Sequence, residues 1–126
     1  MAEKENVITR TSDFIKWFLP KVEKMPRNFK FLFGDRMLKL LIDLLEDLIE
    51  AYYSREKLKP LTTANLRIEK MRHLLRISTD MQWISLPQFE FATRELNEIG
   101  GMTGGWIRQT TMGHTKAAGH GPRQAD

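Results

Sequence analysis

The chain has 126 residues, which is enough for one domain with a single core, and its 41% hydrophobic and 29% charged residues are ordinary for a globular protein. It contains no cysteine, so disulfides and thiolate metal sites are excluded, in keeping with a reducing compartment. No apolar run reaches the roughly 20 residues that span a bilayer, and the charged N-terminal segment lacks a signal-peptide apolar region. We therefore expect a cytoplasmic protein without a membrane partner. The net charge of +4 mildly favours a binding partner that is anionic.

The first helix is predicted to begin near residue 11, after a polar and flexible lead-in at residues 1–10. Thr11 or Ser12 can serve as its N-cap. Pro20 lies inside the helical pattern and predicts a kink or a weakened turn, and Pro26 ends the helix. Apolar residues keep helical spacing at Phe14, Ile15, Phe18, Val22 and Met25.

The second helix, expected from about Asn28 to Tyr53, carries the most apolar surface in the chain. Gly34 lies inside it and costs about 1 kcal/mol relative to alanine, which suggests a close contact at that point. At 100° per residue, the apolar arc is roughly twice what a helix packed on one partner needs. The helix should therefore be buried both by its own core and by something else. Its seam is formed by Leu38, Leu41, Leu45, Leu48 and Tyr52.

The third helix opens at Pro60 and has two apolar stripes. Its core seam consists of Leu61, Ala64, Ile68, Met71 and Leu75. Its second stripe is either a set of scattered surface residues or a second interface. We favour the interface, because the preceding helix also has excess apolar surface. The candidate oligomer contacts on the two helices are Leu40, Leu44, Leu66, Leu74, Ile77 and Met81.

The fourth helix begins with a capping box, in which Ser85 is the N-cap and Gln88 the third helical residue. Two glycine pairs interrupt it, yet Trp106 stays in phase, so we expect it to end at about Arg108. Small residues four apart would allow another backbone to approach closely. Residues 109–126 are polar and without periodicity, which predicts a disordered tail. Four helices with short loops and no strand pattern give an all-α, up-down-up-down four-helix bundle over residues 11–108.

Catalysis is poorly supported by the sequence. Two of the three histidines, His114 and His120, fall in the predicted tail, and no metal-binding motif or phosphate-binding glycine loop is present. We expect no enzyme activity, no cofactor and no metal. A small all-α enzyme remains an alternative, and the absence of polar groups from the helix seams argues against it.

Charge is distributed unevenly along the helices. An acidic strip on the second helix, from Asp43 to Glu50, is either solvated or meets a basic surface such as a helix of a neighbouring subunit. Basic residues cluster elsewhere and can neutralise phosphates of RNA or DNA with little sequence readout, or they only keep the protein soluble. No known nucleic-acid-binding motif accompanies them. The candidate binding residues are Lys21, Lys24, Arg27, Lys30, Arg36, Arg67, Lys70, Arg72 and Arg76.

Several segments together resemble one known family over about residues 10–108. They are the Pro-Arg-Asn of residues 26–28, the Gly-Asp-Arg of residues 34–36, the long apolar helix to Tyr53, and the Glu-Ile-Gly-Gly-Met-Thr-Gly-Gly-Trp-Ile of residues 98–107. This order and spacing is similar to the accessory variability determinant protein, Avd, of diversity-generating retroelements. Avd lies within a wider four-helix-bundle family that includes proteins encoded in intervening sequences of bacterial ribosomal RNA genes.

The resemblance implies a non-enzymatic partner of a reverse transcriptase. Such proteins form a barrel-shaped homopentamer, bind nucleic acid and the reverse transcriptase, and support mutagenic retrohoming. The family offers no binding motif that transfers residue by residue, so the site residues above rest on charge and spacing. Two alternatives remain open. One is a generic RNA-binding or structural member of the wider family without a retroelement, and the other is a structural oligomer whose basic face contacts nothing.

Overall fold

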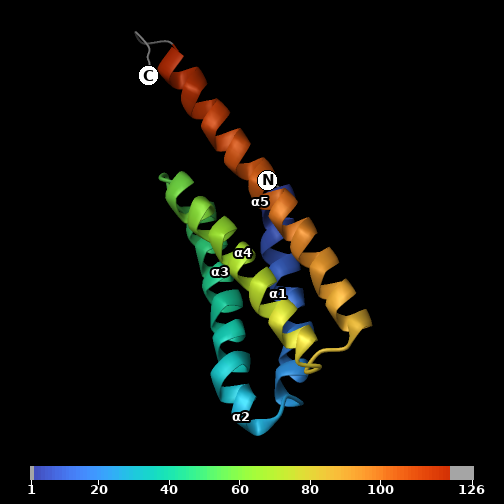
Figure 1. The fold of residues 1–126 in the computed structure, drawn as a ribbon. Helices are drawn as coiled ribbons and strands as arrows, with labels where there is room; N and C mark the ends of the chain where they lie inside the picture. Colours follow the sequence, from blue (N-terminus) through green and yellow to red (C-terminus); the bar gives the residue numbers. More distant parts are fainter. Residues whose placement is uncertain (1, 120–126) are drawn as a thin grey trace.

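The computed structural model describes residues 2–119 of the chain, with side chains for residues 6–113 (Figure 1). Within this part every regular element is helical, and the elements α2, η1 and α3 follow one another directly, which leaves four helical rods. The rods run up and down in alternation, so the predicted all-α four-helix bundle is confirmed. The elements are α1 (Ala2–Glu23), α2 (Arg27–Phe29), the π-helical turn η1 (Lys30–Gly34), α3 (Asp35–Tyr53), α4 (Leu58–Asp80) and α5 (Leu86–Gly119).

Both outer helices extend beyond their predicted ends. Helix α1 begins at Ala2 rather than near Thr11, whose buried hydroxyl donates a hydrogen bond to the Val7 carbonyl at 2.7 Å, as a mid-helix residue does. Helix α1 also continues through Pro20 to Glu23. Helix α5 continues past Arg108 to Gly119, and residues 120–126 lie outside the described part of the chain. The flexibility expected at both ends stays a prediction.

The start of the second rod differs from the predicted continuous α-helix. A π-helical turn has a wider hydrogen-bond ring than an α-helical turn, and η1 therefore shifts the phase of the residues before α3. Phe31 and Leu32, which lie in this turn, are 60% and 68% exposed. The close contact expected at Gly34 is confirmed, because a Cβ there would lie 2.7 Å from Cγ1 of Val22.

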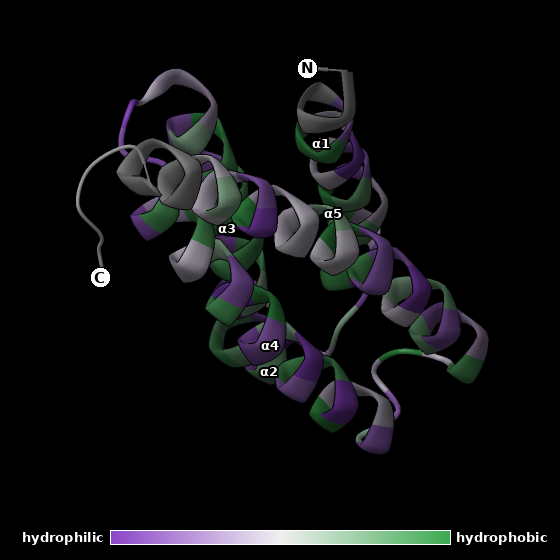
Figure 2. Ribbon diagram, turned by 90° about the horizontal axis from the view of Figure 1, so that it is seen from above, coloured by the Kyte–Doolittle hydropathy of each residue, from purple (hydrophilic) through white to green (hydrophobic). Residues whose placement is uncertain are grey.

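The core is continuous from one end of the bundle to the other. Helix α3 packs against α1 and α4, and α5 closes the other side against the same two helices. Seen along the bundle, each rod carries both hydrophobic and hydrophilic residues (Figure 2). The largest fully buried side chains are Phe14, Phe18, Met37, Leu41, Leu44, Leu48, Leu61, Ile68, Met71, Leu75, Ile84 and Leu96.

Two sets of hydrogen bonds fix α5, one to helix α1 and one within the turn at its own N-terminus. Arg10 of α1 donates two hydrogen bonds to the Glu95 carboxylate, from Nε at 3.0 Å and from Nη2 at 3.3 Å. The hydrogen bond to Glu95 raises the pKa of Arg10. The predicted capping box is confirmed: Ser85 N–H donates to Gln88 Oε1 at 3.0 Å, and Gln88 N–H donates to Ser85 Oγ at 3.2 Å.

The carboxyl end of α4 is closed by a Schellman motif that the sequence did not reveal. Gln82 adopts a left-handed conformation with φ of 66°, a conformation in which glycine is the usual residue. The N–H of Trp83 then donates to the Ser78 carbonyl at 2.9 Å. The Trp83 ring stacks on Phe29 with centroids 4.6 Å apart, which ties the start of the second rod to the α4–α5 turn.

The carboxyl end of α3 depends on one lysine. Nζ of Lys57 donates to the carbonyls of Ala51 at 2.7 Å, Tyr52 at 3.4 Å and Ser54 at 2.7 Å, so an ammonium group satisfies the last carbonyls of the helix.

We expect Lys57→Met to lower the free energy of unfolding by about 1–2 kcal/mol, because methionine keeps the apolar stem and removes the charged donor. Urea denaturation followed by circular dichroism measures the change. Lys59→Met is the matched control, since Lys59 is exposed and its side chain makes no hydrogen bond among the described residues. Equal stability losses in the two variants would contradict the capping role.

Candidate nucleic-acid and partner interface

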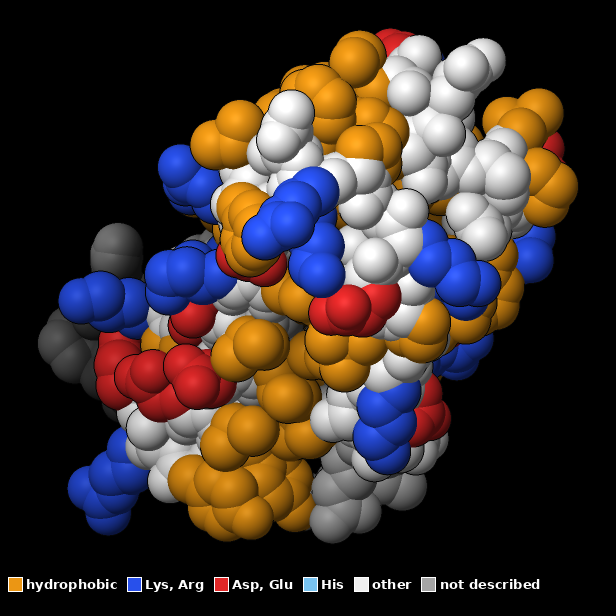
Figure 3. Space-filling view, turned by 90° about the horizontal axis from the view of Figure 1, so that it is seen from below, with side chains coloured by type: hydrophobic (Ala, Val, Ile, Leu, Met, Phe, Trp, Pro, Cys, Tyr) orange, Lys and Arg blue, Asp and Glu red, His pale blue; other side chains and the backbone are white. Residues whose placement is uncertain are grey.

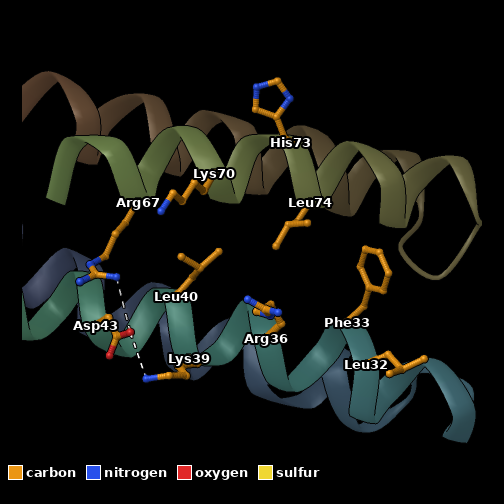
Figure 4. A pocket seen from close by; sticks show the side chains of 10 residues that line it. All are labelled: Leu32, Phe33, Arg36, Lys39, Leu40, Asp43, Arg67, Lys70, His73 and Leu74. Atoms are coloured by element: carbon orange, nitrogen blue, oxygen red, sulfur yellow. Dashed lines mark hydrogen bonds and ion pairs between the residues drawn. The ribbon is translucent and has the colours of Figure 1, made fainter. Parts of the chain in front are cut away.

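An open groove of about 780 Å³ lies on the outside of the bundle between the second rod and α4. Leu40 of α3 and Leu74 of α4 point toward each other across it, and Phe33 lies at one end (Figure 4). Charged side chains surround this apolar floor. The groove is lined by Leu32, Phe33, Arg36, Lys39, Leu40, Asp43, Arg67, Lys70, His73 and Leu74.

Arg67 is held inside the groove by two carboxylates of α3. Its Nε donates to Oδ2 of Asp47, and its Nη1 lies 3.5 Å from Oδ2 of Asp43. Lys39 Nζ lies 3.2 Å from the same Asp43 oxygen, so four charged side chains share one network, of which Figure 4 shows the two contacts of Asp43. Burial raises the pKa of Asp47, and the hydrogen bond from Arg67 opposes that shift. The positive charge of Arg67 is therefore compensated within the protein, and Arg67 is a weak candidate for binding an external phosphate.

Arg36 and Lys70 are the available cations of the groove. Both side chains are exposed, and neither forms an ion pair with another described residue. They lie on opposite walls, Arg36 on α3 and Lys70 on α4. An anionic or acidic group that enters the groove therefore meets uncompensated positive charge on both sides.

A second group of predicted basic residues surrounds the connection from α1 to η1. Lys21 lies over the Trp17 ring, with Nζ 4.4 Å from the centroid, and Lys30 pairs with Glu23 at 3.2 Å. Lys24 and Arg27 are exposed and form no ion pair within residues 6–113. The connection thus presents two unpaired cations beside the exposed ring of Phe31.

The remaining predicted cations lie on the flank of α4 that contacts α5. Arg72 donates from Nε to Glu69 at 3.2 Å and from Nη1 to Asn97, and Arg76 lies over the Phe89 ring at 5.4 Å. The predicted basic residues therefore form three groups rather than one surface: the connection, the groove and the α4–α5 flank.

The predicted oligomer contacts differ in how far they are exposed. Leu66, Ile77 and Met81 are exposed on α4, and Leu40 and Leu74 are half-buried in the groove. Leu44 is 1% exposed and packs inside the bundle, so its side chain cannot serve as a docking contact, contrary to our expectation. Its helical phase placed it on a broad apolar face, and only packing distinguishes the core part of such a face from its edge.

Two basic side chains of the groove, Lys39 and His73, were outside the predicted set of binding residues. The helical phase they share with Arg36 and Lys70 is the sequence signal that points to them.

The glycine-rich stretch of α5 is not a site of backbone contact within the described residues. A Cβ at Gly101 would meet nothing within 4 Å, and at Gly104 or Gly105 it would meet only the Arg108 side chain. At Gly100 it would lie 3.3 Å from Nη2 of Arg72 and 3.9 Å from Ile68, so the close approach at the first glycine is made by side chains of α4 and not by another backbone.

The fold and its groove define an all-helical bundle with charged and apolar outer surfaces. A family model described as bAvd-like matches residues 7–110, and the chain belongs to that family. The resemblance to Avd-type accessory proteins is thereby confirmed. No curated protein and no solved structure matches the chain. Among the described helices, none combines the length and the apolar character that crossing a bilayer requires.

The raised pKa of Asp47 predicts a pH dependence of stability. Between the ordinary aspartate pKa of about 3.9 and the higher folded-state value, the folded chain binds more protons at Asp47 than the unfolded chain does. Stability contributed by this group therefore increases as the pH falls through that window. We expect wild type to gain stability relative to Asp47→Asn on acidification, measured by urea denaturation in a pH series. If the wild type instead loses stability relative to Asp47→Asn, the hydrogen bond from Arg67 outweighs burial and lowers the pKa of Asp47.

Proposed function

We propose that the protein is a non-enzymatic accessory factor of a diversity-generating retroelement. In this role it binds the reverse transcriptase and the template RNA or its cDNA, works as a homo-oligomer, and supports mutagenic retrohoming. Membership of the bAvd-like family supports the retroelement assignment. The pentamer implied by the resemblance is the oligomeric state we expect.

The observation that carries the nucleic-acid proposal is the connection between α1 and η1. Lys24 and Arg27 project there without an ion pair among the described residues, and the Phe31 ring is exposed nearby. Single-stranded nucleic acid is commonly bound by cations that contact phosphates and aromatic rings on which bases stack. This combination favours single strands over a duplex, whose stacked bases a ring on a helical turn cannot reach.

The second candidate function is that of a generic bundle protein without a retroelement. A reverse-transcriptase gene next to the gene for this protein, together with a template and variable repeat pair, would distinguish the retroelement role from it. Copurification of the tagged chain with that polymerase tests the protein partner. A polymerase that elutes without the chain at low salt would contradict it.

We expect the purified protein to bind labelled single-stranded RNA and DNA in fluorescence anisotropy, with an affinity that falls as salt rises. Lys24→Glu with Arg27→Glu should weaken binding at least about tenfold and reduce the salt slope, because phosphate contacts are lost. Phe31→Ala should weaken binding without changing the slope, since stacking releases no counterions.

The matched control is Arg55→Glu with Lys59→Glu, which makes the same charge change at exposed residues of the α3–α4 connection and the start of α4. Equal losses in the two double variants would mean that only net charge matters. No binding at low salt by the wild-type protein would overturn the nucleic-acid role and leave a protein-only adaptor.

A further inference from the structure

Helix α3 has a second apolar surface on the flank opposite the groove. Ile42, Ile49 and Tyr53 are 44%, 38% and 80% exposed, and they follow one another along this flank. At about 100° per residue they point away from Leu40, which faces the groove. We call these three residues, together with the half-buried Leu38 and Leu45, the ridge.

The ridge has an acidic edge. Asp35, Glu46 and Glu50 are exposed on the same side of α3, and none of them forms an ion pair with a described residue. In Figure 3, hydrophobic side chains form a continuous patch beside a cluster of acidic side chains. An apolar surface with carboxylates along its border is the chemical complement of a groove with an apolar floor and unpaired cations on its walls.

We infer that the ridge of one copy of this chain occupies the groove of the next copy. In this contact Ile42 and Ile49 cover the floor formed by Leu40 and Leu74. The inference rests on the self-association proposed above and names the two surfaces that make it. Burial of the exposed apolar residues drives the contact, and the charges fix its partner and orientation.

The charges also determine the symmetry of the contact. A groove placed against a second groove would bring Arg36 and Lys70 of each copy together, and a ridge against a ridge would bring Glu46 and Glu50 together. Both self-complementary arrangements oppose like charges. The favoured contact is therefore heterologous, and because the two surfaces lie on opposite flanks of α3, it can continue from copy to copy and close into a ring.

The groove is continued along α4 by exposed apolar side chains. Ile77 and Met81 are 41% and 50% exposed and follow Leu74 toward the end of the helix. The contact would also remove Arg36 and Lys70 from solution. Phosphate binding would then depend on Lys24 and Arg27, which lie outside both surfaces.

Charge reversal on each surface tests the inference with the full-length protein. The groove variant carries Arg36→Glu and Lys70→Glu, the ridge variant carries Glu46→Lys and Glu50→Lys, and a fourfold variant carries all of these changes. The substituted residues are exposed, so circular dichroism should show intact bundles. Mass is measured by light scattering and analytical ultracentrifugation over a range of protein concentrations.

We expect the wild-type protein to be oligomeric and each single-surface variant to need at least about tenfold more protein to assemble. The fourfold variant should assemble again, because an acidic groove then meets a basic ridge. A 1:1 mixture of the two single-surface variants should also associate at concentrations at which neither variant does so alone, since a contact between the two variants pairs opposite charges. A closed ring with an odd number of copies keeps one contact between like charges, so the mixture tests association and not the wild-type mass. Lys24→Glu with Arg27→Glu is the control that should leave the mass unchanged.

A monomeric wild-type protein, or single-surface variants with the wild-type mass, would overturn the inference. A fourfold variant that stays dissociated would overturn it as well, because the two surfaces would not be each other's partners. Anisotropy with labelled RNA separates this result from the proposed function. A wild-type oligomer whose single-surface variants keep the wild-type mass would contradict only the interface. A wild-type protein that is monomeric yet binds RNA would contradict the self-association and leave the nucleic-acid role standing, and a wild-type oligomer that binds no RNA would contradict only the nucleic-acid role.

Discussion

A helix that is apolar around most of its circumference has to be covered on several sides, and α3 is such a helix. Its core face is covered by α1 and α4, with Leu41 and Leu48 fully buried. Within residues 2–119 there is no further helix that covers its flanks. Leu40 is left in an open groove, and Ile42 is left exposed on the other side. Each Å² of apolar surface that stays in water forgoes about 25 cal/mol, so the uncovered flanks of α3 favour association. The groove and the ridge are thus two consequences of one sequence property.

The number of basic residues in a sequence overstates the charge available to a partner. Arg67 belongs to a dense basic segment, yet two carboxylates of α3 hold it in the groove. Arg72 is similarly occupied by Glu69 and Asn97, and Arg76 by an aromatic ring. Lys24 and Arg27 come from an equally basic stretch and remain unpaired among the described residues. Phosphate binding depends on charge without an internal carboxylate partner. The short connection has two such cations close in sequence to an exposed ring, whereas the unpaired Lys70 of α4 lines the groove.

Local rules were sufficient for the features that depend on neighbouring residues. Helical periodicity predicted the rods and most of the core, but on α3 it placed Leu38, Leu45 and Tyr52 in the seam, and the structure leaves these three half-buried. The Ser85–Gln88 capping box was evident because it needs only two residues at fixed spacing. Tertiary features were not predictable in this way. The turn η1 forms where Val22 packs against Gly34, and the Arg10–Glu95 ion pair joins residues from opposite ends of the chain. Periodicity also could not separate Leu44 in the core from Leu40 in the groove, because both lie within one broad apolar arc.

A ring assembled through the two flanks of α3 would allow several weak phosphate contacts to act together on one strand. Cyclic symmetry places equivalent residues of all copies on one circle, whatever the number of copies. In a ring built by ridge and groove, the Lys24 and Arg27 pairs would lie on such a circle, outside every subunit contact. A single pair of exposed cations binds a strand only weakly, but a strand that reaches several pairs gains from the high effective concentration of the next site. The uncovered apolar flanks of α3 would then determine nucleic-acid affinity without touching the nucleic acid, by setting how many connections are presented together.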